Sequence, residues 1–470
     1  MATKKDLVEA QGFSRRRLLT AFVSGAPGGQ ELEPTKPLRA VVAGVALTVL
    51  LVVGGFAYGL IKPELPKGWD NNSLVVTSDG GSRYVALNGV LYPVLNVASA
   101  RLLIPADAFQ VVQVDATKIA GSKRGTTVGI SGAPDELPGA KGLISSGWLA
   151  CTSATGATAT LLSNDAKAAG VVPTGSATAS ASGQAGAAAV LVQSAGDQYL
   201  VTNGHRYLVP RAHSAGVLRA IGQDLVAPWQ VSARWLNLFP PGTDLDPIDL
   251  AGVGTRVPTG VAAPPGAVVG SVLAVTDGAS DGQRYVVDAD GDLAELSVFA
   301  APLYRLGAGA DVGADIEVTS AQIAGMRTAR DSAGSADWPT TLPGTAAPEN
   351  VPCAQLLTGA QGKDGEPDVR LVFSSAVVVP ATGAEIRVQP AGGALVRAAS
   401  GAPGSGPVLL IDQTGTLFPV PDTSAEMLKR LGFVANQVTT VPAPWLSLFP
   451  AGPALTEAAA GAAPQAAAGT

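Results

Sequence analysis

Histidine and cysteine are scarce in this chain, whose 470 residues include only two of each. A histidine-based metal site or a Ser-His-Asp triad would have to use His205 or His213. We expect His205 in a hairpin turn and His213 just before a helix, both at the surface. The sequence therefore predicts no catalytic, cofactor-binding or metal-binding residues.

Charged residues make up 14% of the chain, well below the usual quarter. The first 39 residues hold seven Lys/Arg and four Asp/Glu, whereas the remainder is acidic, as the net charge of −6 requires. An acidic main body is unsuited to non-specific binding of nucleic acid. We therefore expect no nucleic acid among the partners.

A phosphate-binding loop of the Walker A type is missing. Gly362-Lys363-Asp364 is the nearest match, but Leu357 stands where the leading glycine belongs and Asp364 where Ser or Thr would bind Mg²⁺. The run Asp288–Asp292 resembles part of a calcium loop but lacks the remaining ligands, so we interpret it as a hairpin turn.

Charge is also absent from Ala40–Ile61, a run of apolar and small residues between Pro37 and Pro63. As a helix it would be roughly 33 Å long, which matches a hydrocarbon core of about 30 Å. Most cations precede it, so the positive-inside rule places the N-terminus in the cytoplasm. We therefore expect a single-pass protein of the cell membrane with an extracytoplasmic C-terminal domain.

Two other interpretations of this N-terminal region were weighed. A cleaved signal peptide has a shorter apolar stretch, of about 7–15 residues, followed by a small-residue cleavage site. Ser14–Leu19 resembles a twin-arginine signal, but about twenty polar residues separate it from the apolar run. A retained anchor is the preferred interpretation.

The segment Lys4–Ser24 can form a basic amphipathic helix, with Leu7, Leu18 and other apolar residues near one face. Such a helix could lie on an anionic membrane surface or dock on a partner subunit; a solvated helix is the alternative. The residues expected to dock on the cytoplasmic side are Phe13, Arg15, Arg16 and Arg17.

The rest of the chain contains internal repeats. Trp235–Pro240 and Trp445–Pro450 share the pattern WLxLFP, and each follows a hairpin and a predicted helix. Weaker copies of the hairpin occur at 83–94 and 284–296. Copies of this kind indicate one structural unit repeated with interfaces between the copies.

Two Gly/Ala-rich segments with strand-like runs, such as Thr158–Leu162, Ala189–Val192, Val369–Phe373 and Val377–Val379, separate the repeats. We expect an α+β fold with four ββα-type repeats around a central β domain. The stretch 174–189 is interpreted as a flexible excursion. The predicted parts are a cytoplasmic segment 1–39, a transmembrane helix 40–61, a linker 62–80, repeats 81–119, 196–247, 282–325 and 401–452, central segments 120–195 and 326–400, and a disordered tail 453–470.

Each central segment contains one cysteine, Cys151 or Cys353. Both follow the predicted membrane helix, on the side where disulfides persist. A bridge between them would close a loop of about 200 residues, worth up to about 5 kcal/mol in chain entropy. Two unrelated buried thiols are the alternative.

The aromatic residues of the WLxLFP endings have two possible roles. Trp235, Phe239, Trp445 and Phe449 could pack each repeat onto its neighbour, or they could be exposed anchors for a partner subunit. Internal packing is preferred, because the leucines around them alternate.

The chain resembles the EccB family of type VII secretion systems over nearly its whole length. The resemblance implies a disulfide between Cys151 and Cys353 and a multi-subunit inner-membrane export complex containing an FtsK/SpoIIIE-type ATPase. The third repeat is degenerate. The resemblance rests on the order of several short motifs: Phe13 with Arg15–Leu18, the apolar helix, Arg83-Tyr84, Asn88-Gly89, Tyr92–Val94, Gly129–Asp135 with Leu137-Pro138, Trp148 before Cys151, and Trp445–Pro450.

The predicted function is that of a structural and assembly subunit, which associates with copies of itself and with other membrane subunits. An extracytoplasmic ATPase, proposed for the family, or a module that binds or hydrolyses the cell wall are the alternatives. An enzyme requires a convergent cluster of ionisable residues, and the sequence supplies none that we could identify.

Overall fold

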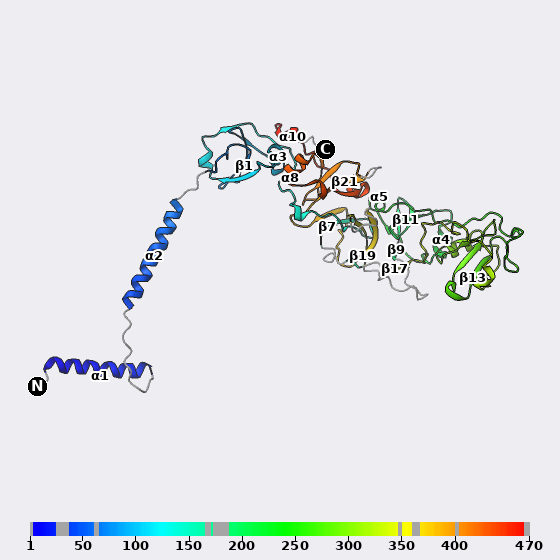
Figure 1. Ribbon diagram of the computed structural model, residues 1–470, viewed down its shortest axis with the longest axis horizontal. Helices are drawn as coiled ribbons and strands as arrows, with labels where there is room; N and C mark the ends of the chain where they lie inside the picture. Colours follow the sequence, from blue (N-terminus) through cyan, green and yellow to red (C-terminus); the bar gives the residue numbers. More distant parts are fainter. Residues whose placement is uncertain are drawn as a thin grey trace. The chain divides into compact units, whose positions relative to one another are not determined.

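The computed structural model describes residues 3–24, 37–60, 65–164, 171–172, 188–345, 350–359, 367–399 and 404–464. The chain divides into two units, Met1–Pro66 and Lys67–Thr470. The described part of the first unit forms two helices, and the second unit contains several small sheets with short helices (Figure 1). The mixed α+β class is therefore confirmed.

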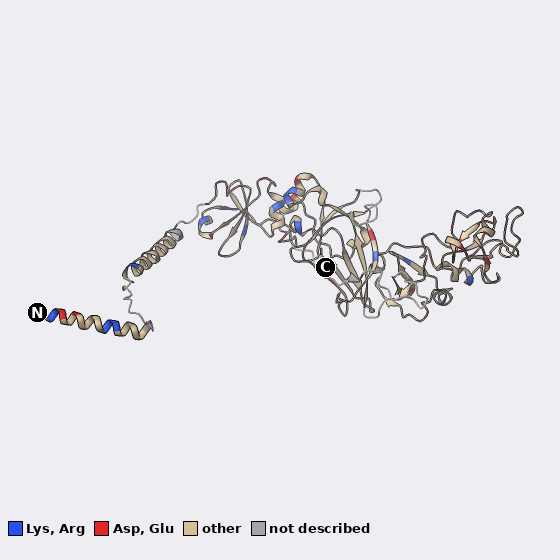
Figure 2. Cartoon of the chain, turned by 60° about the horizontal axis from the view of Figure 1, so that its bottom comes forward, with Lys and Arg blue, Asp and Glu red and all other residues tan. Residues whose placement is uncertain are grey.

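The first unit consists of α1 (Lys4–Ser24) and α2 (Pro37–Leu60). The bounds of α1 agree with those predicted, and Figure 2 shows its cations near its start and in its middle. Within α2, Leu38–Phe56 is long and apolar enough to cross a membrane. Ile61, the last residue of the predicted segment, lies outside the described residues.

The second unit contains four small sheets with one shared strand order. In each, a first strand pairs antiparallel with the second, the second pairs antiparallel with the third, and a fourth strand runs parallel to the first. A seven-residue helix lies between the third and fourth strands. A parallel pair needs a crossover of this kind, because its two strands run in the same direction.

The first sheet contains β1 (Ser73–Thr77), β2 (Arg83–Leu87), β3 (Val90–Pro93), α3 (Val97–Leu103) and β4 (Gln110–Val114), with β5 (Lys123–Arg124) beside β3. The second contains β9 (Ala188–Ser194), β10 (Asp197–Thr202), β11 (His205–Val209), α4 (Ser214–Ala220) and β12 (Trp229–Gln230), with β17 (Gly344–Thr345) also on β9.

The third sheet contains β13 (Val272–Val275), β14 (Arg284–Val287), β15 (Leu293–Glu295), α6 (Ala300–Leu306) and β16 (Ile316–Val318), followed by α7 (Ser320–Ile323). The fourth contains β21 (Ala394–Ala399), β22 (Val408–Ile411), β23 (Leu417–Val420), α8 (Ala425–Leu431) and β24 (Thr439–Pro442). Each sheet thus includes a strand that precedes the repeat boundary expected from the sequence.

A fifth sheet has six strands drawn from both Gly/Ala-rich segments. Its strand order is β20 (Ala384–Val388), β7 (Thr158–Leu162), β6 (Trp148–Thr152), β18 (Val351–Leu357), β19 (Asp368–Ser374) and β8 (Val171–Val172). Two strand-like runs lie elsewhere than expected: Ala189–Val192 belongs to β9 in the second sheet, and Val377–Val379 forms no strand. Most of the predicted excursion 174–189 lies outside the described residues.

Two kinds of turn join the hairpins. Asn88-Gly89 and Asn203-Gly204 have positive φ at both residues, which a two-residue type I′ turn requires. In the longer turn at 288–292, the Asp288 carboxylate accepts hydrogen bonds from the backbone N–H of Asp290 and Asp292. The interpretation of this acidic run as a hairpin turn is confirmed.

Local capping defines the ends of two of the crossover helices, α3 and α8. The N-cap Asn96 accepts from the N–H of Ser99 at the start of α3, and Ser424 does the same for Met427 in α8. Gly432 ends α8 with a φ of 93°, a conformation that glycine adopts without strain.

The disulfide Cys151–Cys353 joins β6 to β18, strands that are 202 residues apart in sequence. The two cysteines are direct partners in the antiparallel register, and both are fully buried. They lie on one face of the six-stranded sheet with Leu149, Ala159 and Val372. The alternative of two unrelated thiols is thereby excluded.

The C-terminal tail is a correction to the sequence prediction. Residues 453–464, expected to be disordered, include α10 (Glu457–Gly461), capped by Thr456. Leu455 and Ala460 are fully buried in a cluster that includes residues of α3 and α8. Burial against these distant segments orders a stretch whose composition favours disorder; residues 465–470 lie outside the described residues.

Loss of the disulfide should lower the free energy of unfolding of the second unit. The double variant Cys151→Ala/Cys353→Ala frees the denatured chain from a long closed loop, so we expect a loss of about 3–5 kcal/mol. Urea denaturation of the full chain measures the change, with reduced wild-type protein as the control. A denaturation midpoint equal to that of oxidised wild type would contradict the prediction.

Candidate functional site

The first WLxLFP segment begins with α5 (Ala233–Leu236) and packs onto the six-stranded sheet. Ser232 caps this helix by accepting from the backbone N–H of Trp235. The indole Nε1–H of Trp235 donates to the carbonyl of Ala150 in β6 at 2.8 Å. The Trp235 and Phe239 rings lie edge to face, with centroids 5.2 Å apart. This segment is therefore held to the sheet by both packing and a hydrogen bond.

The second WLxLFP segment begins with α9 (Ala443–Leu446) and packs onto the same face. Trp148 of β6 meets Trp445 and Phe449 edge to face, at centroid distances of 6.5 and 5.8 Å. The indole N–H of Trp148 donates to the carbonyl of Ile144. The indole N–H of Trp445, by contrast, is buried without a partner in the part of the chain that the structure describes.

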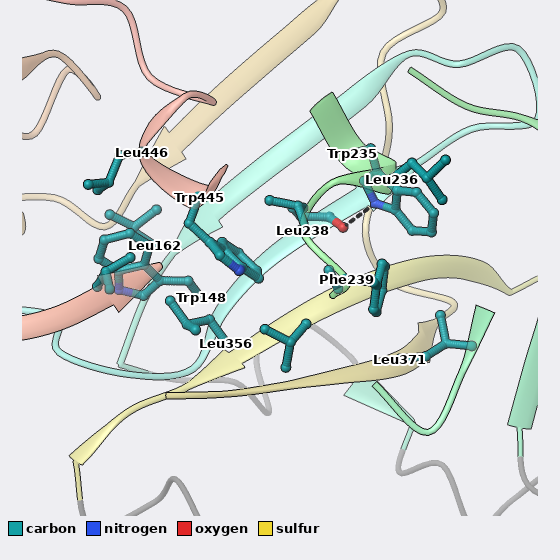
Figure 3. Close-up of a cluster of buried hydrophobic side chains, with 14 of the residues drawn as sticks. Trp148, Leu162, Trp235, Leu236, Leu238, Phe239, Leu356, Leu371, Trp445 and Leu446 are labelled. Atoms are coloured by element: carbon teal, nitrogen blue, oxygen red, sulfur yellow. Dashed lines mark hydrogen bonds between the residues drawn. The ribbon is translucent and has the colours of Figure 1, made fainter. Parts of the chain in front are cut away.

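The four aromatic residues of these segments lie in one buried cluster, in which Figure 3 labels Trp235, Phe239 and Trp445. Trp235, Phe239 and Trp445 are fully buried and Phe449 nearly so. The cluster also contains Trp148 and other residues of the six-stranded sheet. The structure thus places the WLxLFP side chains inside the second unit, where they join the second and fourth small sheets to the central one.

A glycine two positions beyond each shared motif was missed in the sequence. A Cβ added to Gly242 would lie 2.4 Å from the Tyr207 ring, and one added to Gly452 would lie 2.5 Å from the Phe418 ring. Both glycines donate a backbone hydrogen bond to the third strand of their sheet, at Arg206 and Leu417. Extending the alignment from WLxLFP to WLxLFPxG would have found them.

Tyr207 of β11 is fully buried. It contacts Asp337, which is distant in the sequence of this unit. Its hydroxyl donates to the carbonyl of Asp337 at 2.5 Å, and the Asp337 carboxylate accepts from the backbone N–H of Thr243 at 2.7 Å. Burial, and secondarily the negative charge of Asp337, raises the pKa of Tyr207 to about 12.

Residues 129–138, which are part of the pattern that resembles the EccB family, bond to two distant parts of the second unit. The Asn96 side chain donates to the carbonyl of Ile130, and Arg83 forms an ion pair with Asp135 at 2.6 Å. The N–H of Gly129 donates to the carbonyl of Ala462 in the C-terminal segment. The stretch therefore links the first small sheet to the end of the chain.

His213 lies where the sequence predicts it, whereas His205, expected at the surface in a hairpin turn, is the first residue of β11. His205 is half-buried beside the hairpin turn, and exposed His213 precedes α4 and lies 3.0 Å from the Asp246 carboxylate. Among the described residues, no group of three His, Cys, Asp or Glu side chains could hold a metal ion. Gly362–Asp364, the nearest match to a phosphate loop, lies outside them.

A serine between two glycines lies between two strands of the third small sheet. Gly278–Gly282 has the spacing G-x-S-x-G, which in hydrolases marks a sharp strand-to-helix turn. Here it connects β13 to β14, two adjacent antiparallel strands. The turn is therefore part of a hairpin, and Ser280 does not stand at the strand-to-helix elbow that the motif requires.

The N-terminal residues expected to dock on a partner all lie on α1. Phe13 is 55% exposed, and Arg15, Arg16 and Arg17 are exposed beside it.

The family described as "Type VII secretion system ESX-1, transport TM domain B", or EccB, matches residues 1–468. The chain belongs to the EccB family. The match covers both units, so the resemblance noted in the sequence is confirmed.

Curated relatives within the EccB family span nearly the same length. The chain is 27% identical to "ESX-3 secretion system ATPase EccB3" of Mycobacterium tuberculosis, covering 96% of this chain and 90% of the relative. It is 28% identical to "ESX-2 secretion system ATPase EccB2" of the same species, covering 90% and 88%.

Solved structures from ESX-5 and ESX-3 complexes share the fold. A chain of an intact ESX-5 inner membrane complex matches with a TM-score of 0.65 and 22% identity, over 98% of this chain and 95% of that one. A chain of an EccB3 dimer from the ESX-3 core complex matches with a TM-score of 0.66 and 23% identity, over 83% and 100%.

Trp235 and Trp445, the tryptophans of the two WLxLFP segments, should contribute differently to the free energy of unfolding. Trp235→Phe removes ring atoms and the hydrogen bond to Ala150, whereas Trp445→Phe removes ring atoms and an unpartnered N–H. We expect Trp235→Phe to lower the free energy of unfolding by about 1 kcal/mol more. Urea denaturation of the two variants measures this, and equal or reversed losses would contradict it.

Tyr207 should make this EccB protein lose stability in alkali. The unfolded phenol ionises near pH 10, whereas the folded one keeps its proton up to about pH 12. Stability is therefore fully present below pH 10 and falls between pH 10 and 12. We expect wild type to lose about 1 kcal/mol more than Tyr207→Phe between pH 9 and 11, as measured by urea midpoints; parallel losses would count against it.

Proposed function

We propose that this chain is a structural and assembly subunit of a type VII secretion complex in the cell membrane. Membership of the EccB family, matched over residues 1–468, is the observation that carries the proposal. The structural relatives belong to ESX inner membrane complexes. In this function α2 anchors the chain, and the second unit makes contacts with other copies and subunits.

The proposed topology is single-pass, with the N-terminus in the cytoplasm. The apolar helix Leu38–Phe56 supports a membrane anchor. The cations of α1, which precedes this helix, and Arg39 at its start support the orientation. The disulfide Cys151–Cys353 supports an extracytoplasmic second unit, because disulfides persist on that side of the membrane.

The four small sheets are proposed to be copies of one repeat around the six-stranded sheet. Their shared strand order supports this. So do equivalent backbone bonds: the third strand of the second sheet exchanges bonds with residues 240 and 242, and that of the fourth with 450 and 452. The third sheet has the same pattern at Leu293, which bonds with 327 and 329.

The proposed partners are further membrane subunits of the complex, including an FtsK/SpoIIIE-type ATPase, and a second copy of this chain. The relative known as an EccB3 dimer supports self-association. Helix α1 is proposed to contact the cytoplasmic subunits through Phe13, Arg15, Arg16 and Arg17, since exposed apolar and basic side chains gather there.

The assembly function is tested by purification of the tagged full chain in mild detergent. We expect other secretion-complex subunits to co-purify, and we expect Arg15→Gln/Arg17→Gln to lower their recovery several-fold by removing two cations. Mass spectrometry quantifies the recovery, and Lys4→Gln/Lys5→Gln is the control for loss of charge alone. Recovery of wild type as an isolated monomer would reject the assembly function.

ATP hydrolysis is the second candidate function, favoured by the names of the curated relatives. The wild-type full chain, purified away from other ATPases, tests it directly. Hydrolysis that persists through purification and is abolished by a single substitution in this chain would establish the activity. If the chain is an assembly subunit without catalytic activity, its rate of ATP hydrolysis should equal that of a mock purification.

A further inference from the structure

A hydroxyl-lined hollow of about 390 Å³ lies where the WLxLFP segments meet the six-stranded sheet. Its floor includes Thr158 and Thr160, alternate residues of β7, and its walls include Ser232, Arg234, Thr382 and Leu448. Alternate residues of a strand point to the same face. The next residue in that row, Leu162, lies in the aromatic cluster near Trp148 (Figure 3).

The two floor threonines are almost completely buried yet lack partners. Thr158 is 8% exposed and Thr160 is 3% exposed. Neither hydroxyl bonds to a residue in the part of the chain that the structure describes, and both residues line the hollow. Neither hydroxyl oxygen is among the fully enclosed side-chain atoms that lack a partner, so both oxygens are open to the hollow and can bond to whatever fills it.

The charge around the hollow is positive. Arg234 lines it and has no partner among the described residues, and none of the lining residues is acidic. The nearest carboxylate in sequence, Glu385, is paired with Arg387 at 2.7 Å. A guanidinium offers a fork of N–H donors that suits carboxylate and phosphate oxygens, and hydroxyl groups supply further donors.

We propose that this hollow is a binding site for a small ligand that carries an oxyanion, either a carboxylate or a phosphate. Arg234 pairs with the oxyanion at the rim, and Thr158 and Thr160 donate hydrogen bonds from the floor. Leu448 contacts apolar atoms of the ligand. Ser232 caps the first WLxLFP segment, Arg234 belongs to it, and Leu448 belongs to the second. Occupation of the site would therefore tie the second and fourth sheets together.

Arginine labelling with phenylglyoxal, followed by peptide mass spectrometry, tests the site in the full-length protein. At constant ionic strength, about 20 mM inorganic phosphate or acetate should slow the labelling of Arg234 about fivefold, as expected for millimolar affinity. Exposed Arg256, which also lacks a partner in the described chain, is the internal control and should keep its rate. Protection by phosphate alone or by acetate alone identifies the preferred oxyanion.

The hydroxyl groups are tested by Thr160→Val, which keeps the side-chain shape. We expect this variant to lose most of the protection of Arg234 while its unprotected labelling rate stays that of wild type. Thr126→Val, at an exposed position in the first part of the unit, should keep full protection. Equal rates for Arg234 with and without both anions, or equal slowing of Arg256, would overturn the proposal.

Discussion

The pairing of β6 with β18 is the constraint on which the second unit depends. It sets Cys151 opposite Cys353 and Ala150 opposite Ala354, although about 200 residues lie between them. The loop-closure entropy of so long a connection opposes the pairing. The disulfide removes much of that cost from folding, because the denatured chain is already closed. Both halves of the chain can then contribute to a single six-stranded sheet.

The two faces of this sheet are used differently. One face buries the disulfide with small and branched side chains, including Val377 from an irregular segment. The other face receives both WLxLFP segments, whose tryptophans meet β6 at Ala150 and Trp148. Strand β6 therefore makes the disulfide with one face and holds the aromatic segments with the other. The hollow lies beside β7. There the side chains of β7 on this second face change from Leu162, in the aromatic cluster, to Thr160 and Thr158, which line the hollow.

Sequence patterns with short-range causes were the most predictable. The uncharged run specified α2, and the repeated Trp and Phe residues identified two segments that pack alike. The first strand of each small sheet was not recognised, because an apolar run such as Ala188–Ser194 reads equally well as part of a neighbouring sheet. Its place depends on pairing with Asp197–Thr202.

Features that depend on distant residues were not predictable. The order of 453–464 arises from burial of Leu455 and Ala460 against α3 and α8, which an Ala-rich composition does not reveal. Thr158 and Thr160 can bond to a ligand because no residue in the described part of the folded chain is hydrogen-bonded to their hydroxyl groups. The matching glycines 242 and 452, in contrast, were present in the sequence and were overlooked, because the alignment stopped at proline.

Amide hydrogen exchange of the full-length protein tests the central pairing most directly. If β6 and β18 form the middle of one sheet, the amides of 149–151 and 353–356 should be among the slowest to exchange. They should also share one opening free energy, close to that of global unfolding. Fast exchange in either strand, or clearly different opening free energies for the two, would contradict the account.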